Sequence, residues 1–199
     1  MVIPFKKYGT WFAKYGGVIS VLSEWFALFF FYLQFPEAFT GEHTISYFAT
    51  LSQTKVVFIL CYLLAAVSFW AFAIHHLKKH YRTPVTFFAI SMICFGGMAL
   101  YPFTFEDSLR YGIHLTLAHT SFVTFLAGVY LLGRRNDDKL LHKVSVITVV
   151  MTGTLLLLFV TVPKHSQYIM PLETGAWLVI QLWLLWISFY VAKRKPLAV

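Results

Sequence analysis

The chain of 199 residues is 59% hydrophobic and only 12% charged, and it has a formal net charge of +8 at pH 7. Its mean hydropathy is +0.71. Soluble domains carry about 25% charged residues, so this composition excludes an ordinary soluble domain and is typical of a membrane protein. A net charge of this sign favours nucleic-acid binding in a soluble protein, but the positions of the basic residues, described below, assign it to a membrane surface instead.

Six apolar stretches are long enough to cross the roughly 30 Å of hydrocarbon in a bilayer. The first follows Lys6, Lys7 and Lys14 but contains Glu24 and lacks a small-residue cleavage site, so we predict an uncleaved span and not a signal peptide. No linker or repeat divides the chain, which predicts a single transmembrane domain covering residues 1–199. The predicted fold class is all-α, a bundle of six transmembrane helices over residues 16–34, 55–74, 84–103, 113–133, 144–163 and 175–192.

The basic residues predict the orientation of these spans. Thirteen of the sixteen lie in the N-terminal segment, after spans two and four, and after span six; only Lys55, Arg110 and Lys164 fall on the other side. The positive-inside rule therefore places both termini in the cytoplasm, which an even number of spans also requires. The basic side then forms a rim that faces anionic lipid headgroups.

Acids and histidines collect on the opposite, outer side. The set comprises Glu37, Glu42, Glu106, Asp107, Glu173, His43, His114 and His165. Carboxylates and imidazoles together can ligate a metal or move protons. Outer loops must also be polar to contact water, and no H-E-x-x-H spacing distinguishes the two interpretations.

One acid and two histidines fall inside the predicted spans. A charge on Glu24, near the middle of span one, costs at least about 2.5 kcal/mol, so this residue must face the bundle interior, be protonated or have a partner. His114 and His119 lie in span four, five residues and about 140° apart, and cannot both ligate one ion from the same face. We interpret His119 as a polar contact between helices, and leave functional and structural roles open for Glu24.

Small and aromatic residues in the spans are interpreted as packing. Glycine lets transmembrane helices approach closely. We assign this role to Gly96, Gly97, Gly128 and Gly153, and we interpret the 21 phenylalanines as lipid-facing bulk.

Four stretches in chain order resemble a known family. They are "ISYFATLSQTKVVF" (45–58), "GGMALYPFTFED" (96–107), "HLTLAHTSF" (114–122) and "PLETGAW" (171–177). Together they resemble the DUF 998 family of six-helix bacterial membrane proteins, which is similar in layout to the eukaryotic Frag, DRAM and Sfk group. The chain departs from the pattern where Ala49 or Thr50 replaces a glycine, where "YPFTFED" is longer, and where Thr174 replaces an arginine.

The resemblance implies a shared position for four residues and a connection with lipids. Its motifs match Ser46, Asp107, His114 and Glu173, which it would bring together at the outer ends of the helices. The eukaryotic relatives are associated with lipid remodelling and membrane organisation, and the bacterial family has no settled activity. The resemblance also implies a bacterial inner membrane as the location.

We therefore expect a protein that binds or modifies a lipid at a polar site in the outer leaflet. A cavity between spans one, three, four and six would hold the acyl chains. If the protein is an enzyme, a lipid hydrolase or transferase, His114 is the expected general base, with Asp107 and Glu173 beside it. The same three residues are the candidates for a divalent metal such as zinc. The further residues expected to contact the lipid are Glu24, Ser46, Glu106, His119 and His165.

Two other functions stay open. One is a proton-coupled transporter in which Glu24 and His119 form a relay. The other is an accessory or structural membrane subunit. Haem is not expected, because the histidines near the inner side sit among cations and no C-x-x-C-H motif exists.

Overall fold

The computed structural model describes residues 5–40, 43–78, 81–101, 108–134, 138–163 and 166–193, with side chains at all of these except 5–10, 40, 192 and 193. Within these ranges the chain is all-helical and contains no strand. Its elements, in chain order, are α1 (Phe5–Gln34), η1 (Pro36–Thr40), η2 (Ile45–Ala49), α2 (Lys55–His76), α3 (Arg82–Leu100), α4 (Ser108–Arg134), α5 (Lys139–Thr161) and α6 (Ile169–Lys193), where η denotes a 3-10 helix.

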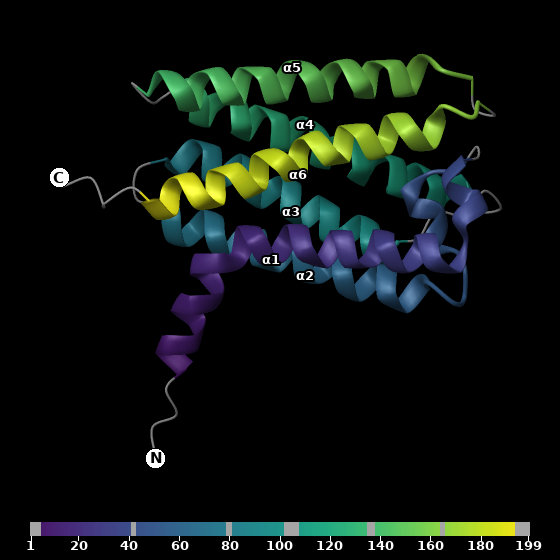
Figure 1. Ribbon diagram of the computed structural model, residues 1–199, viewed down its shortest axis with the longest axis horizontal. Coiled ribbons are helices and arrows are strands. Elements are labelled where there is room, and N and C mark those ends of the chain that lie inside the picture. The colour runs from purple at the N-terminus through teal and green to yellow at the C-terminus, as the bar shows by residue number, and fades with distance from the viewer. Residues whose placement is uncertain are drawn as a thin grey trace.

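The six α-helices form an up-and-down bundle, and each is long and apolar enough to cross a membrane. Helices that follow one another in sequence pack side by side, and α6 returns to pack against α1 (Figure 1). The start of α1 and the end of α6 lie at one end of the bundle, which we call the terminal end. The short helices η1 and η2 lie at the other, the η end (Figure 1).

Each predicted span overlaps one of the six helices, and several helices extend beyond their span. The spans predicted to end at residues 103 and 163 instead run past α3 and α5, which end at Leu100 and Thr161. α1 begins at Phe5 and not at residue 16, α4 begins at Ser108 and not at 113, and α6 begins at Ile169 and not at 175. Hydropathy detects the apolar part of a helix, whereas polar residues at its ends continue the same backbone hydrogen bonding. Pro171 is tolerated because the first-turn N–H groups of a helix have no partner within the helix.

Aromatic side chains fill the bundle interior, which corrects the interpretation of phenylalanine as lipid-facing bulk. Phe69, Phe88, Phe125 and Trp183, from four different helices, contact one another with ring centroids 5.3–5.9 Å apart. The fully buried phenylalanines are Phe31, Phe48, Phe58, Phe69, Phe72 and Phe88. Lipid is as apolar as a protein core, so apolar composition alone does not distinguish the two faces of a transmembrane helix.

Only some of the glycines predicted to allow close packing do so. A Cβ on Gly128 would lie 2.7 Å from the ring of Phe88, whereas one on Gly153 would meet nothing within 4 Å. The prediction for Gly153 is therefore wrong. The tightest approach to a backbone atom had not been predicted: a Cβ on Gly16 would lie 2.1 Å from the backbone oxygen of Ser68. At Gly16 the backbones of α1 and α2 meet directly.

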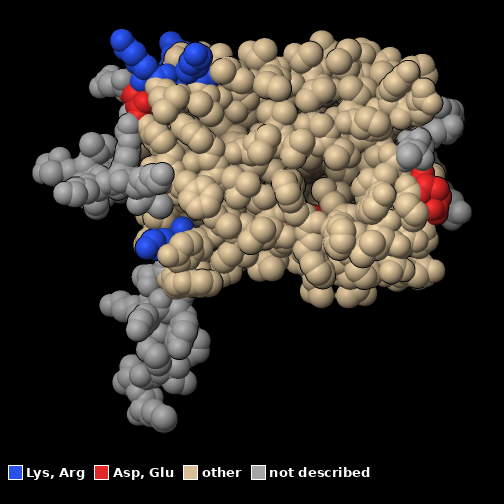
Figure 2. Space-filling view, in the orientation of Figure 1, with Lys and Arg blue, Asp and Glu red and all other residues tan. Residues whose placement is uncertain are grey.

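Charged side chains are separated along the bundle. Lysine and arginine gather at the terminal end, near the α2–α3 and α4–α5 connections, while most of the visible acidic atoms lie at the η end (Figure 2). The long flank between the two ends is almost free of charge on the face shown. This separation follows the pattern on which the predicted orientation depends, and the orientation itself stays a prediction.

Candidate functional site

Glu173 and the residues beside Ser46 meet at the η end. Glu173, in the second turn of α6, accepts a hydrogen bond of 2.7 Å from the backbone N–H of Ile45, the first residue of η2. Ser46 follows directly, is buried, and lies 2.9 Å from Thr44 through their hydroxyl oxygens. The carboxylate therefore satisfies an N–H at the start of a short helix that has no partner within that helix.

His114 connects α4 to the end of α3. Its ring is buried, and Nδ1 lies 2.8 Å from the carbonyl oxygen of Tyr101, the residue that caps α3. Asp107, Glu106 and His165, which were also predicted to contribute to the site, lie outside the described residues. Among the residues that are described, no group of three or more His, Cys, Asp or Glu side chains is arranged to hold a metal ion.

His119 lies on a different face of α4 from His114. The side chain is exposed, and Nδ1 lies 2.7 Å from the carbonyl oxygen of Leu115 in its own helix. The bond made by Nδ1 is therefore local and is not the predicted contact between helices. A relay through both Glu24 and His119 would have to cross from the interior of the bundle to its outer surface.

Glu24, the one acid in span one, faces the interior of the bundle, and its partner is Gln181. The carboxyl group is buried, and Oε2 accepts a hydrogen bond of 2.7 Å from Nε2 of Gln181 on α6. Oε1 of Gln181 accepts a hydrogen bond in turn from Nε1 of Trp25. Both ends of the Gln181 amide are thus engaged by α1, and we call Glu24, Gln181 and Trp25 the amide network.

Gln181 was not among the residues predicted to contribute to the site. The available signal was a single amide in the middle of "WLVIQLWLLW", where a polar side chain in a transmembrane helix needs a partner. Gln181 lies twelve residues from the start of α6, and Glu24 lies ten before the end of α1. At 1.5 Å per residue these positions are about 15–18 Å from the η end, close to the middle of a bilayer core.

Tyr62 lies within electrostatic range of both the amide network and the η end. This side chain of α2 is buried and lies close enough to both Glu24 and Glu173 to interact electrostatically with each. Its ring stacks on Phe58 and also contacts Trp177. Two carboxyl groups, one in the middle of the bundle and one near its η end, therefore share a tyrosine neighbour.

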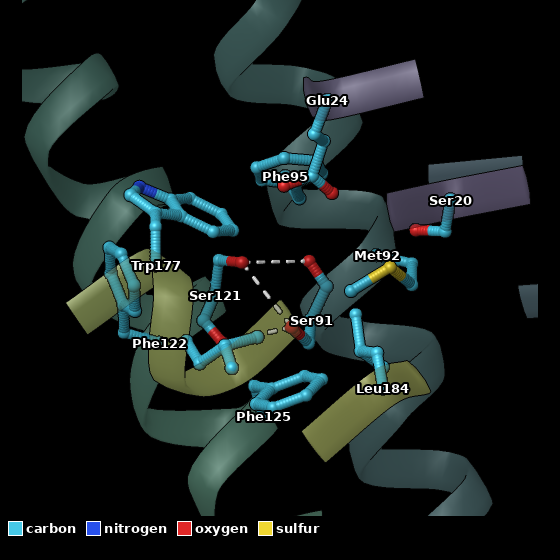
Figure 3. Close-up of a pocket in the computed structure, with 11 residues that line it drawn as sticks. Ser20, Glu24, Ser91, Met92, Phe95, Ser121, Phe122, Phe125, Trp177 and Leu184 are labelled. Carbon is cyan, nitrogen blue, oxygen red and sulfur yellow. Dashed lines mark hydrogen bonds between the residues drawn. The ribbon is translucent and has the colours of Figure 1, made fainter. Parts of the chain in front are cut away.

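A small cavity lies beside Glu24, and we call it the inner chamber. Its volume is about 20 Å³, and its walls come from α1, α3, α4 and α6 (Figure 3). These are the helices between which an acyl-chain cavity was expected, but a space of this size holds about one water molecule and not an acyl chain. The lining residues are Ser20, Glu24, Ser91, Met92, Phe95, Ser121, Phe122, Phe125, Trp177, Ile180 and Leu184.

Two serines form the polar floor of the inner chamber. The hydroxyl of Ser91 donates to the carbonyl oxygen of Ser121 at 2.9 Å, and the hydroxyl of Ser121 donates to the carbonyl oxygen of Ser91 at 3.1 Å. This reciprocal pair joins α3 to α4. The carboxyl group of Glu24 points toward it from the opposite wall (Figure 3).

A second hollow opens on the flank of the bundle between α1 and α6, and we call it the lateral groove. It has a volume of about 190 Å³ and is lined by Trp25, Leu28, Thr174, Trp177, Leu178 and Gln181. The space-filling view shows a depression on the otherwise uncharged flank, with a trace of an acidic residue visible within it (Figure 2). Trp177 lines both the groove and the inner chamber, and the groove's Gln181 bonds Glu24.

The groove also contains a polar atom without a partner. The hydroxyl oxygen of Thr174 is buried and has no hydrogen-bond partner within the described part of the chain. A buried polar group without a partner costs about 1–3 kcal/mol, which a ligand with a matching polar group would offset once the Thr174 side chain turns its hydroxyl into the groove. The groove therefore combines two indole rings, two leucines and an unused hydroxyl.

No family model, no curated protein and no solved structure matches the chain. The resemblance to the DUF 998 family accordingly stays a prediction, and the function must be argued from the geometry.

Proposed function

We propose that this protein binds a membrane lipid through the lateral groove. The observation that carries the proposal is the position of the groove, which opens between two helices able to cross a membrane on a flank almost free of charge (Figure 2). A ligand that enters there comes from the lipid phase and not from water. Binding sites in membrane helices commonly lie between neighbouring helices, where a few polar groups orient an apolar ligand.

The lining of the groove fits an acyl lipid. Thr174 lies five residues into α6, about 8 Å from the η end, and Gln181 lies about 10 Å deeper. We place the ester region of the lipid at Thr174, with the acyl chain running between Trp25 and Trp177 toward Gln181. The groove is smaller than the 300–1,000 Å³ of drug-sized pockets, so it would hold part of a chain and not the whole lipid.

A larger hollow on α4 is a weaker candidate. It has a volume of about 360 Å³, but it is lined by residues of one helix only, from Ser108 to Leu117. No buried polar atom without a partner is found among those lining residues. The lateral groove, in contrast, is lined by two helices, and its Thr174 has a buried hydroxyl oxygen without a partner.

The wider setting is part of the proposal. We propose a multi-pass protein of the bacterial inner membrane with both termini in the cytoplasm, since the basic residues gather at the terminal end. That end would face anionic headgroups. Modification of the bound lipid by His114, Asp107 and Glu173, with or without a divalent metal, also stays a prediction.

Retention of lipid by purified protein tests the proposal. Leu178→Trp would fill the groove, whereas Leu182→Trp, one turn further along α6 and outside the groove, is the matched control; both leucines are partly exposed, at 43% and 54%. Native mass spectrometry should find a lipid adduct on the wild type and on Leu182→Trp, but little on Leu178→Trp. Equal retention by the two variants would exclude the groove as the binding site.

A further inference from the structure

The inner chamber presents hydrogen-bond acceptors. The hydroxyl protons of Ser91 and Ser121 are both directed to backbone carbonyls, so their oxygens have lone pairs left for the chamber. Glu24 points its carboxyl group into the same space (Figure 3). A polar guest in the chamber would therefore have to donate hydrogen bonds or carry positive charge.

Within the described part of the chain, no basic side chain lines the space around Glu24. None of the residues that line the inner chamber or the lateral groove is a lysine, arginine or histidine. The lining residues from α3, α4 and α6 are serine, methionine, aromatic and aliphatic residues, and the ionisable neighbour from α2 is Tyr62. An ionised carboxylate near the middle of a bilayer needs a compensating positive charge.

The size and geometry of the chamber fit a single small ion. The hydroxyl oxygens of Ser91 and Ser121 are 3.3 Å apart. Both can therefore contact one small cation at about 2.4 Å, a usual distance between such a cation and its oxygen ligands. The volume of about 20 Å³ leaves room for one such guest. A divalent ion would leave excess positive charge in a chamber with one carboxyl group, so a monovalent ion fits better.

We propose that the inner chamber binds one Na⁺ ion in exchange for the proton of Glu24. Binding converts the carboxylic acid to the carboxylate, which coordinates Na⁺ together with the oxygens of Ser91 and Ser121, and one proton is released for each ion bound. Charge is balanced in both states. This proposal does not depend on which ligand occupies the lateral groove, and loss of lipid binding would leave it unaffected.

Proton release by the wild-type protein is the direct test. Purified protein in weakly buffered detergent solution at pH 8 is titrated with NaCl, and released protons are followed with a pH-sensitive dye. We expect saturable release that approaches one proton per chain, with none on addition of choline chloride at equal ionic strength. Absence of proton release at pH 8, together with absence of bound ²²Na⁺ at pH 6 and pH 8, would overturn the proposal.

Variants assign the effect to the chamber. Glu24→Gln keeps a side-chain oxygen that can accept from Gln181 but has no exchangeable acid proton, so it should abolish proton release. Ser121→Ala should weaken ²²Na⁺ binding at least tenfold, whereas Ser23→Ala, beside Glu24 but outside the chamber lining, should leave it unchanged. Proton release that persists in folded Glu24→Gln would place the site elsewhere and contradict the proposal. If Glu24→Gln does not fold, the wild-type titration and the Ser23→Ala and Ser121→Ala pair still decide the question.

Discussion

Nε2 of Gln181 donates a hydrogen bond of 2.7 Å to Oε2 of Glu24, joining the middle of α6 to the middle of α1. The two helices are the first and last of the bundle, so this bond closes it across the seam where the lateral groove opens. The polar residue that was hardest to explain in span one thus has a partner 157 positions away in the sequence.

The Glu24–Gln181 pair should show strong energetic coupling. Gln181→Leu leaves the Glu24 carboxyl group without its donor and should lower the free energy of unfolding by about 1–3 kcal/mol. The double variant Glu24→Leu with Gln181→Leu should be less destabilised than the sum of the two single variants, by roughly 1–2 kcal/mol. Unfolding by SDS titration measures the free energy of unfolding of Glu24→Leu, Gln181→Leu and the double variant.

A control separates the two bonds made by Gln181. Trp25→Phe removes only the indole donor, so it should cost less than Gln181→Leu and should not alter the coupling between Glu24 and Gln181. If the double variant lost as much free energy of unfolding as the two single variants together, the bond would not join the helices in the membrane.

Glu173 should act through its acceptor oxygen and not through its charge. Glu173→Gln keeps an oxygen that can accept from the N–H of Ile45, whereas Glu173→Ala removes it. We expect faster amide exchange over Ile45–Ala49 in the alanine variant and near-normal exchange in the glutamine variant. Loss of protection in both would show that the negative charge holds η2 in place.

Two glycines provide a matched test of helix packing. Gly16→Ala places a Cβ 2.1 Å from a backbone oxygen of α2, which cannot move aside without shifting the helix, so it should destabilise the bundle by several kcal/mol. Gly153→Ala meets open space and should stabilise the protein by roughly 0.5–1 kcal/mol through helix propensity. Thermal unfolding in detergent compares them, and equal effects would contradict the described α1–α2 contact.

Thr174 should have opposite effects on stability and on binding. Thr174→Val removes a buried hydroxyl without a partner, so the lipid-free protein should gain up to about 1 kcal/mol. The same change removes the proposed contact with the lipid ester and should weaken lipid retention about tenfold, a loss of about 1.4 kcal/mol. Unfolding of the delipidated protein measures its stability, and native mass spectrometry measures its lipid retention. Lower stability with unchanged lipid retention would assign the hydroxyl a structural role.

The helical architecture could be predicted from the sequence because hydropathy and helix length respond to the same physical constraint. A helix that crosses hydrocarbon must be apolar over about 20 residues, and each of the six predicted spans overlaps a helix. The boundaries differ at residues such as Phe5 and Ile169, because these helices continue through polar residues such as Lys14 and Glu173 that interrupt the apolar pattern.

The candidate site could be predicted only in part. Glu24 was identified because an acid in an apolar span must be accommodated. Its partner Gln181 and the Ser91–Ser121 pair depend on which helix faces lie together, and the sequence does not fix those faces when lipid and core are equally apolar. His119 illustrates the limit, since its position in span four did not reveal that it lies on the exposed face of α4.

The proposal that a lipid occupies the lateral groove is tested most directly by photolabelling in a membrane. A lipid with a photoactivatable group on its acyl chain is incorporated at low mole fraction, irradiated, and mapped by peptide mass spectrometry. We predict label concentrated on Trp25, Leu28 and the residues from Thr174 to Gln181, and displaced by excess unlabelled lipid. Label spread evenly over exposed residues such as Val150 and Leu157 of α5, and not reduced by competition, would contradict the account.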